Sequence, residues 1–146
     1  MLFSSIVFLL FLSAFFSGVE TAMMSLNRYR LKHLVKENDK GAIRADKLLK
    51  RPDRLLGVIL IGNNFVNILA ASLTTVLCLN LFGDSGVVIG SIVLTLIILV
   101  FAEITPKTFA ALNSEKVALP ASLILKYFKK YSDLWFYLLI SFQTFL

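Results

Sequence analysis

Four polar side chains lie inside long apolar stretches of this sequence, and their oxygen atoms are the first sign of chemistry. Ser17 occurs in "FFSGVETAMMS", Asn63 and Asn67 in "GNNFVNILAAS", and Glu103 in "LVFAEITPKTFAAL". A hydroxyl, two amide carbonyls and a carboxylate are hard oxygen ligands, and no Cys or His accompanies them in these stretches. Such a set favours magnesium, sodium or calcium over soft or borderline metals.

The neighbourhood of Glu103 combines a charge with a helix breaker. A carboxylate is costly inside an apolar helix, and Pro106 removes a backbone hydrogen bond and strains the preceding turn. We expect Pro106 to leave a carbonyl of that turn unpaired and directed into a cavity, a device that recurs at ion sites in transporters. Gly18 and Gly62 would allow neighbouring backbones to approach closely.

Purely structural roles for these residues remain open at this point. Asn and Ser in membrane helices often only hydrogen-bond a neighbouring helix. Glu103 and Lys107 are four residues apart, in the order that favours an ion pair within one helix. Glu20 has no basic residue within one helical turn, so it either pairs with a distant Lys or Arg or contacts a second cation.

The elements that must position these residues are predicted to be membrane-spanning helices. The chain has 146 residues, is 58% hydrophobic and has a mean hydropathy of +0.81, which is far above the soluble average. Three apolar segments, about residues 2–27, 55–82 and 87–112, each exceed the roughly 20 residues that a span needs. The first has no basic residues before it, which argues against a signal peptide. The sequence therefore predicts an all-α polytopic membrane protein.

The four candidate ligands are expected to lie at a similar depth in the membrane. At about 1.5 Å per residue, the four candidate ligands lie roughly 14 to 20 Å from the basic ends of their helices. Asn63 and Asn67 share one helix face because they are four residues apart. Cys78 lies in an apolar run, and we expect it to be a free thiol in the interior.

The basic residues predict the orientation. Ten of the 15 Lys and Arg residues lie between Arg28 and Arg54, and serial spans place the other five on the same side. The opposite loop, "NLFGDSG", carries only Asp84. Basic loops remain in the cytoplasm, so the N-terminus is expected outside the plasma membrane. The net charge of +6 thus fits a membrane surface better than nucleic acid, because no recognition motif accompanies it.

The last region, about residues 116–146, interleaves lysines with aromatic residues such as Tyr127, Tyr131 and Trp135. This pattern is typical of amphipathic helices that lie in the membrane interface. The sequence stops within the apolar run "SFQTFL", from which we expect the natural chain to continue. Gly86 and Gly90, four residues apart, form a small-residue face that serves either a dimer or packing within one protomer.

Three motifs now carry a family resemblance. The stretches "FSGVETAMMSLNRYRL", "GNNFVNILAAS" and "AEITPKTFA" resemble the transmembrane domain of the CorC/CNNM magnesium transporters, one motif per helix and in the same order. The resemblance covers about residues 1–140. It implies three spans followed by juxtamembrane helices, a homodimer, and a largely dehydrated magnesium ion between the helices.

The same resemblance assigns roles to the candidate residues. The coordinating hydroxyl of the family matches Ser17, its amides match Asn63 and Asn67, its carboxylate matches Glu103, and its helix-breaking proline matches Pro106. It further implies sodium as an exchange partner, for which Glu20 is a weak candidate contact. It also implies a cytosolic pair of CBS modules after this domain, and no such region is present in these 146 residues.

The sequence is thus interpreted as a transporter domain rather than an enzyme. Magnesium would be exported, or exchanged for sodium, by alternating access through the site between the helices. The alternative is a membrane scaffold or regulatory subunit whose intramembrane polar residues only lock the helices together.

Overall fold

The computed structural model describes the backbone of residues 1–145 and the side chains of residues 1–134 and 137. Every element in this part of the chain is helical: α1 (Leu2–Ser25), α2 (Arg28–Lys36), α3 (Lys40–Leu49), α4 (Pro52–Phe82), α5 (Asp84–Ile97), the π-helix η1 (Ile98–Ile104), α6 (Thr105–Leu112) and α7 (Ser114–Phe145). Three helical stretches are long and apolar enough to cross a membrane, namely Leu2–Ser25, Pro52–Phe82 and Asp84–Leu112. The predicted fold class is confirmed, with boundaries shifted by up to three residues.

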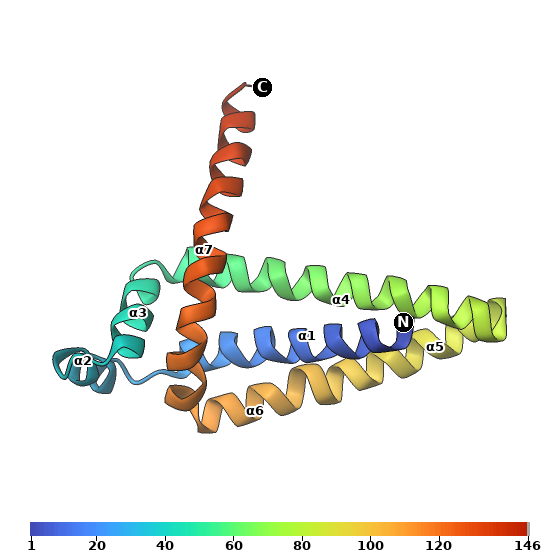
Figure 1. Cartoon of the computed structure of the whole chain (residues 1–146), viewed down its shortest axis with the longest axis horizontal. Helices are drawn as coiled ribbons and strands as arrows, with labels where there is room; N and C mark the ends of the chain where they lie inside the picture. The colour runs from blue at the N-terminus through green and yellow to red at the C-terminus, as the bar shows by residue number, and fades with distance from the viewer. Residues whose placement is uncertain (146) are drawn as a thin grey trace.

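The three spans lie side by side along the long axis of the molecule, and α7 runs across one end of them (Figure 1). α1 packs against α4 on one side and against η1 and α6 on the other. Its buried side chains, among them Phe16, Val19 and Met23, join Leu55 and Ile59 of α4 in the core. Many large apolar side chains of α4 and α5 are exposed, as lipid-facing surfaces require.

Local chemistry explains where the second span begins and ends. α4 starts with Pro52, whose missing N–H is harmless in the first helical turn, and Asp53 there complements the positive end of the helix. It ends at Gly83, whose φ of 69° lies in the left-handed region that favours glycine. Gly83 alone separates α4 from α5, so the two helices form a tight hairpin.

The third span changes its helical type before the proline. Over the seven residues of η1, the usual i→i+4 pattern widens to i→i+5. The backbone N–H and the hydroxyl of Thr105 both donate to the carbonyl of Val100, the hydroxyl at 2.7 Å. Pro106 has no N–H for the carbonyls of Phe101 or Ala102. The break expected at Pro106 is therefore a π-helical segment on its N-terminal side.

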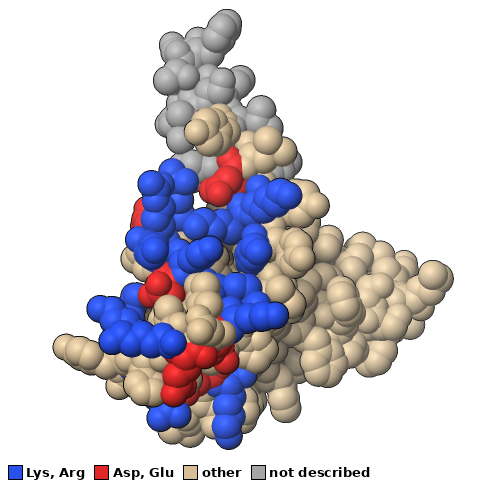
Figure 2. Space-filling model, turned by 60° about the vertical axis from the view of Figure 1, so that its left-hand side comes forward, with Lys and Arg blue, Asp and Glu red and all other residues tan. Residues whose placement is uncertain are grey.

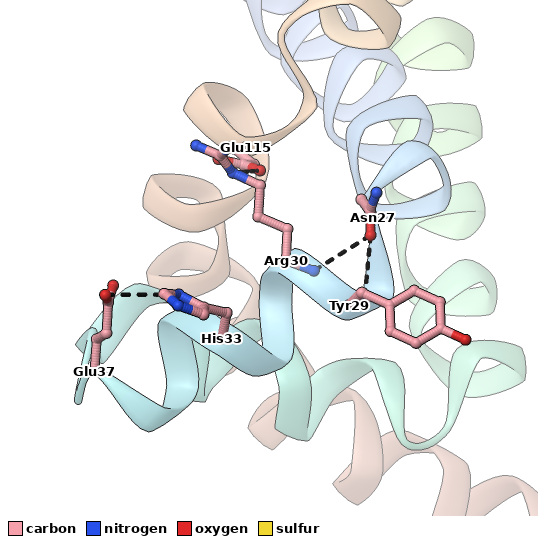
Figure 3. A network of polar contacts seen from close by, with 6 residues as sticks. All are labelled: Asn27, Tyr29, Arg30, His33, Glu37 and Glu115. Carbon is pink, nitrogen blue, oxygen red and sulfur yellow. Dashed lines mark hydrogen bonds and ion pairs between the residues drawn. The ribbon is translucent and has the colours of Figure 1, made fainter.

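Two short helices in the basic segment were missed by the sequence analysis, which treated residues 28–54 only as a charged loop. Asn27 caps α2 by accepting from the N–H groups of Tyr29 and Arg30, at 3.0 and 3.2 Å (Figure 3). Asp39 caps α3 by accepting from the N–H of Ala42 at 2.7 Å. An Asn or Asp before each helix is a recognisable start signal, and it was overlooked.

The expected juxtamembrane region, about residues 116–146, is a single helix, α7, which begins slightly earlier and contains Pro120. Arg30 of α2 pairs with Glu115 at the start of α7 (Figure 3), and Arg54 of α4 lies 3.6 Å from Asp133. The side chain of Trp135 and the whole of Leu146 lie outside the described residues. Lys and Arg gather at the end of the molecule where α2, α3 and α7 meet (Figure 2).

Gly86 and Gly90 face α4 of the same protomer. A Cβ at Gly90 would collide with Sγ of Cys78, and one at Gly86 would collide with Cβ of Phe82. Of the two roles left open for this small-residue face, the structure thus supports packing within one protomer, against the buried free thiol of Cys78.

Cysteine labelling tests the orientation that the basic residues predict. Ser85 lies at the tip of the α4–α5 hairpin and Lys40 starts α3 at the other end, and both are exposed. In a Cys78→Ala background, a cysteine at position 85 should react with a membrane-impermeant maleimide from outside intact cells, and one at position 40 only after permeabilisation. The reverse pattern would contradict an outside N-terminus.

A rescue experiment tests the Gly90–Cys78 contact. Gly90→Ala should lower the melting temperature in detergent, because overpacking typically costs about 1–3 kcal/mol. Cys78→Ala in the same chain should restore most of this loss by removing the colliding sulfur. Gly57→Ala is the matched control, because a Cβ at Gly57 would meet nothing within 4 Å. If Gly90→Ala changed the oligomer mass rather than the stability, the face would belong to a dimer.

Candidate functional site

The centre of the site is a cluster of three oxygen atoms between α1 and α4. The Ser13 hydroxyl of α1 lies 3.1 Å from Oδ1 of Asn63 and 2.7 Å from Oδ1 of Asn67. A serine hydroxyl has one hydrogen to donate, so it can satisfy only one of these two carbonyl oxygens at a time. Two amide carbonyl oxygens and a hydroxyl oxygen thus converge between α1 and α4, an arrangement that suits a cation.

Ser17 lies one helical turn after Ser13 on the same face of α1. Its side chain is fully buried, and Oγ has no hydrogen-bond partner among the described residues. A buried hydroxyl without a partner typically costs about 1–3 kcal/mol. The structure therefore holds an oxygen whose bonding capacity is unused.

Gly18 brings α1 close to the third span. A Cβ at Gly18 would lie 3.5 Å from the carbonyl oxygen of Pro106 and 3.9 Å from Cβ of Ala110, which is ordinary van der Waals contact. The residue after Ser17 thus adjoins the residue that breaks the third span. The π-helix η1, which precedes Pro106, also packs on α1.

Glu103 lies within η1 and is partly exposed. Among the described residues it makes no ion pair and no side-chain hydrogen bond, and it is not paired with Lys107. The intrahelical Glu103–Lys107 ion pair, one of the structural alternatives, is not formed in this structure. Glu103 is joined to the Asn63–Asn67 amides by no direct contact.

The remaining candidates take supporting positions. Gly62 lies beneath the ring of Phe16, where a Cβ would meet ring carbon Cζ at 2.9 Å, so it sets the separation of α1 and α4 next to Asn63. Glu20 is partly buried and makes no ion pair in the described part of the chain. Lys107 is likewise partly buried.

Ser13 is the site residue that the sequence analysis missed. It repeats the spacing of the two asparagines, because Ser13 and Ser17 are also four residues apart. That repeat was the available signal. It was overlooked because Ser13 stands alone in "FLSAFF", whereas Ser17 is followed by glycine and a carboxylate.

The chemistry of the donor set limits which ions fit. Within the described residues no group of three or more His, Cys, Asp or Glu side chains is placed to hold a metal. The candidate ligands are neutral oxygens together with one carboxylate, and such a set suits a hard cation better than a transition metal.

Comparison with known proteins agrees with the fold and the motifs. Residues 5–144 match the family described as the cyclin M transmembrane N-terminal domain, CNNM. The chain is 57% identical over 114 residues to the UPF0053 inner membrane protein YfjD of Escherichia coli, covering 78% of this chain and 27% of that protein. It is 52% identical over 124 residues to a UPF0053 protein of Haemophilus influenzae, covering 85% and 30%.

A more distant relative is a chloroplastic DUF21 domain-containing protein of Arabidopsis thaliana, 41% identical over 111 residues, or 75% of this chain and 17% of that protein. The chain thus spans less than a third of the length of these curated relatives. The match over nearly all of its residues shows that it belongs to the CNNM family, as the transmembrane N-terminal domain, and the resemblance drawn from its three motifs is confirmed.

Proposed function

We propose that this domain transports magnesium across the membrane through the site between α1, α4 and η1. The observation that carries the proposal is the buried Ser17 hydroxyl without a partner, one turn from the acceptor-rich Ser13–Asn63–Asn67 cluster. An intramembrane position that keeps such an oxygen despite its cost is expected to bind something that the protein alone does not supply.

The chemistry suits an ion that is reluctant to lose water. Magnesium normally keeps several of its waters, so a protein that strips them must offer a dense set of oxygens and at least one negative charge. Ser13, Ser17 and the two asparagines supply the neutral oxygens. Glu103 supplies the charge, and because no described residue forms an ion pair with it, that charge is available to the ion.

In this proposal, the π-helix η1 is the element that moves during transport. Residues 98–104 carry Glu103 and lie directly before Pro106, so their backbone bonding is less regular than that of α5 or α6. Short π-helical segments recur at functional sites. In this proposal, alternating access moves Glu103 towards and away from the serine face of α1 as η1 changes its helical spacing.

Further parts of the proposal follow from family membership and charge. We propose that transport is coupled to sodium and that the domain forms a homodimer in the plasma membrane with its N-terminus outside. We also propose that it works together with a cytosolic CBS region. Glu20 is the proposed contact for a second cation, because it is partly buried and makes no ion pair in the described residues.

The second candidate function is a scaffold, and one observation favours it. The Ser13 hydroxyl bridges α1 to α4, which is how polar residues lock helices together in membranes. Ser17 argues against this alternative, because its hydroxyl bonds no described residue and therefore does not link two helices.

Ser17→Ala distinguishes magnesium transport from a scaffold, because the two functions predict opposite changes in the stability of the magnesium-free protein. Removing an unpartnered hydroxyl should raise the stability of the magnesium-free protein, by up to about 1–3 kcal/mol. The same change should raise the magnesium concentration needed for thermal protection, by roughly tenfold for each 1.4 kcal/mol of lost ion binding. Melting curves in detergent across a magnesium titration measure both quantities.

Asn67→Ala should weaken magnesium protection in the same way, and Asn64→Ala is its matched control because Asn64 is exposed on another face of α4. Wild-type protein that gains no thermal protection from magnesium, together with a destabilising Ser17→Ala, would support the scaffold instead.

Glu103→Gln tests the charge by magnesium flux in proteoliposomes. A divalent cation in a low-dielectric site without a counter-charge is far costlier than one that has lost a single dipole. Glu103→Gln should therefore abolish flux, and Glu103→Ala should abolish thermal protection at any attainable concentration. Lys107→Ala should leave both mostly intact, because Lys107 is not the partner of Glu103. If Glu103→Ala and Lys107→Ala lowered thermal protection equally, Glu103 would be structural.

Repeating the flux assay with and without a sodium gradient tests whether magnesium transport is coupled to sodium.

A further inference from the structure

A basic pocket lies between α3 and α7, away from the ion site. It has a volume of about 510 Å³, and Ile43 and Leu48 contribute apolar walls. Its lining includes one acidic residue, Asp133, and five basic residues: Arg44, Lys47, Lys126, Lys129 and Lys130. The pocket therefore has a formal charge of +4 and attracts an anion.

The charges of this pocket are not neutralised within the protein. Lys47, Lys126, Lys129 and Lys130 make no ion pair with any described residue. Asp133 lies 3.6 Å from Arg54 of α4, so its carboxylate is shared with a cation outside the pocket. In α2, by contrast, Arg30 pairs with Glu115 and His33 lies beside Glu37 (Figure 3).

One cation of the pocket is held in place. Nε of Arg44 donates to the hydroxyl of Ser122 at 3.3 Å, and Ser122 is fully buried between α3 and α7. This bond uses one of the five N–H groups of the guanidinium and leaves the others for a ligand. Guanidinium groups suit phosphate because they can donate two parallel hydrogen bonds.

The surroundings identify which anion would come to this pocket. α7 crosses the end of the spans where the basic residues gather (Figures 1 and 2). Between its lysines the pocket is lined by the exposed ring of Tyr127, opposite the apolar side chains of Ile43 and Leu48. A ligand here meets cations and an apolar surface together, which matches a phosphate headgroup joined to acyl chains.

We propose that the α3–α7 pocket binds the headgroup of an acidic phospholipid and so anchors α3 and α7 to the membrane surface. The proposal goes beyond diffuse attraction of a basic surface, because it assigns a defined pocket with walls from two helices. It is independent of the magnesium site, and neither depends on the other.

Native mass spectrometry of the detergent-solubilised chain tests the proposal, with dioleoyl phosphatidylglycerol as the probe and dioleoyl phosphatidylcholine as the neutral comparison. The pocket variant is Lys47→Gln with Lys130→Gln, one exposed lysine from each wall. The matched control is Lys32→Gln with Lys36→Gln, which removes two exposed charges from α2 outside the pocket.

The pocket variant should bind phosphatidylglycerol at least tenfold more weakly, since each Lys near an anionic membrane surface contributes about 1 kcal/mol. The control should change binding by less than about threefold, and phosphatidylcholine should bind all three proteins weakly and alike. Unchanged melting temperatures establish that both variants fold.

Two results would overturn the proposal. Equal weakening in the pocket variant and in the control would mean diffuse surface electrostatics without a site. Full displacement of the lipid by a few millimolar inorganic phosphate would mean a pocket for free phosphate rather than for a lipid headgroup.

Discussion

An oxygen atom inside a hydrocarbon layer must find a partner within the protein, because no water is present to supply one. This constraint explains why the three candidate spans are helical throughout, since a helix satisfies its own backbone. It also explains the Thr105 hydroxyl bonded to Val100, and the hydroxyls of Ser72, Thr74 and Ser91 bonded one turn back in their helices. Against this background, the Ser17 hydroxyl, which has no partner among the described residues, and the neighbouring Ser13–Asn63–Asn67 cluster mark the candidate site.

Helix α1 is the element on which the site depends, because it contacts both other spans. Its small residues Ser13, Ser17 and Gly18 allow α4 and α6 to approach, while Phe16 fills the space above Gly62. The residues that supply oxygens are thus also the residues that permit close packing. A larger side chain at Ser13, Ser17 or Gly18 would remove a candidate oxygen or push α1 away from the helices that carry the other candidate oxygens.

Much of the fold could be predicted because the signals were compositional. Three apolar segments of sufficient length fixed the spans, and the clustering of lysine and arginine indicated that one end of the bundle is basic. The helices α2 and α3 were not predicted, because their apolar faces are short and only the N-cap residues Asn27 and Asp39 indicate where they begin. Likewise, the motifs led to Ser17, Asn63, Asn67 and Glu103, whereas the four-residue spacing of Ser13 and Ser17 was too weak a signal to show that Ser13 contacts the asparagines of α4. Contacts such as Gly90 with Cys78 depend on the register between two helices, which sequence spacing alone does not determine.

The three spans differ in length, and this has a consequence for the bilayer. At about 1.5 Å per residue, the 24 residues of α1 extend about 36 Å, whereas the 31 residues of α4 extend about 46 Å. The hydrocarbon layer is only about 30 Å thick, so α1 fits it with little tilt while the α4–α5 hairpin must tilt or project beyond it. Membrane thickness therefore acts directly on the α4–α5 hairpin, because a thinner bilayer requires more tilt of these helices or leaves more of them outside the hydrocarbon.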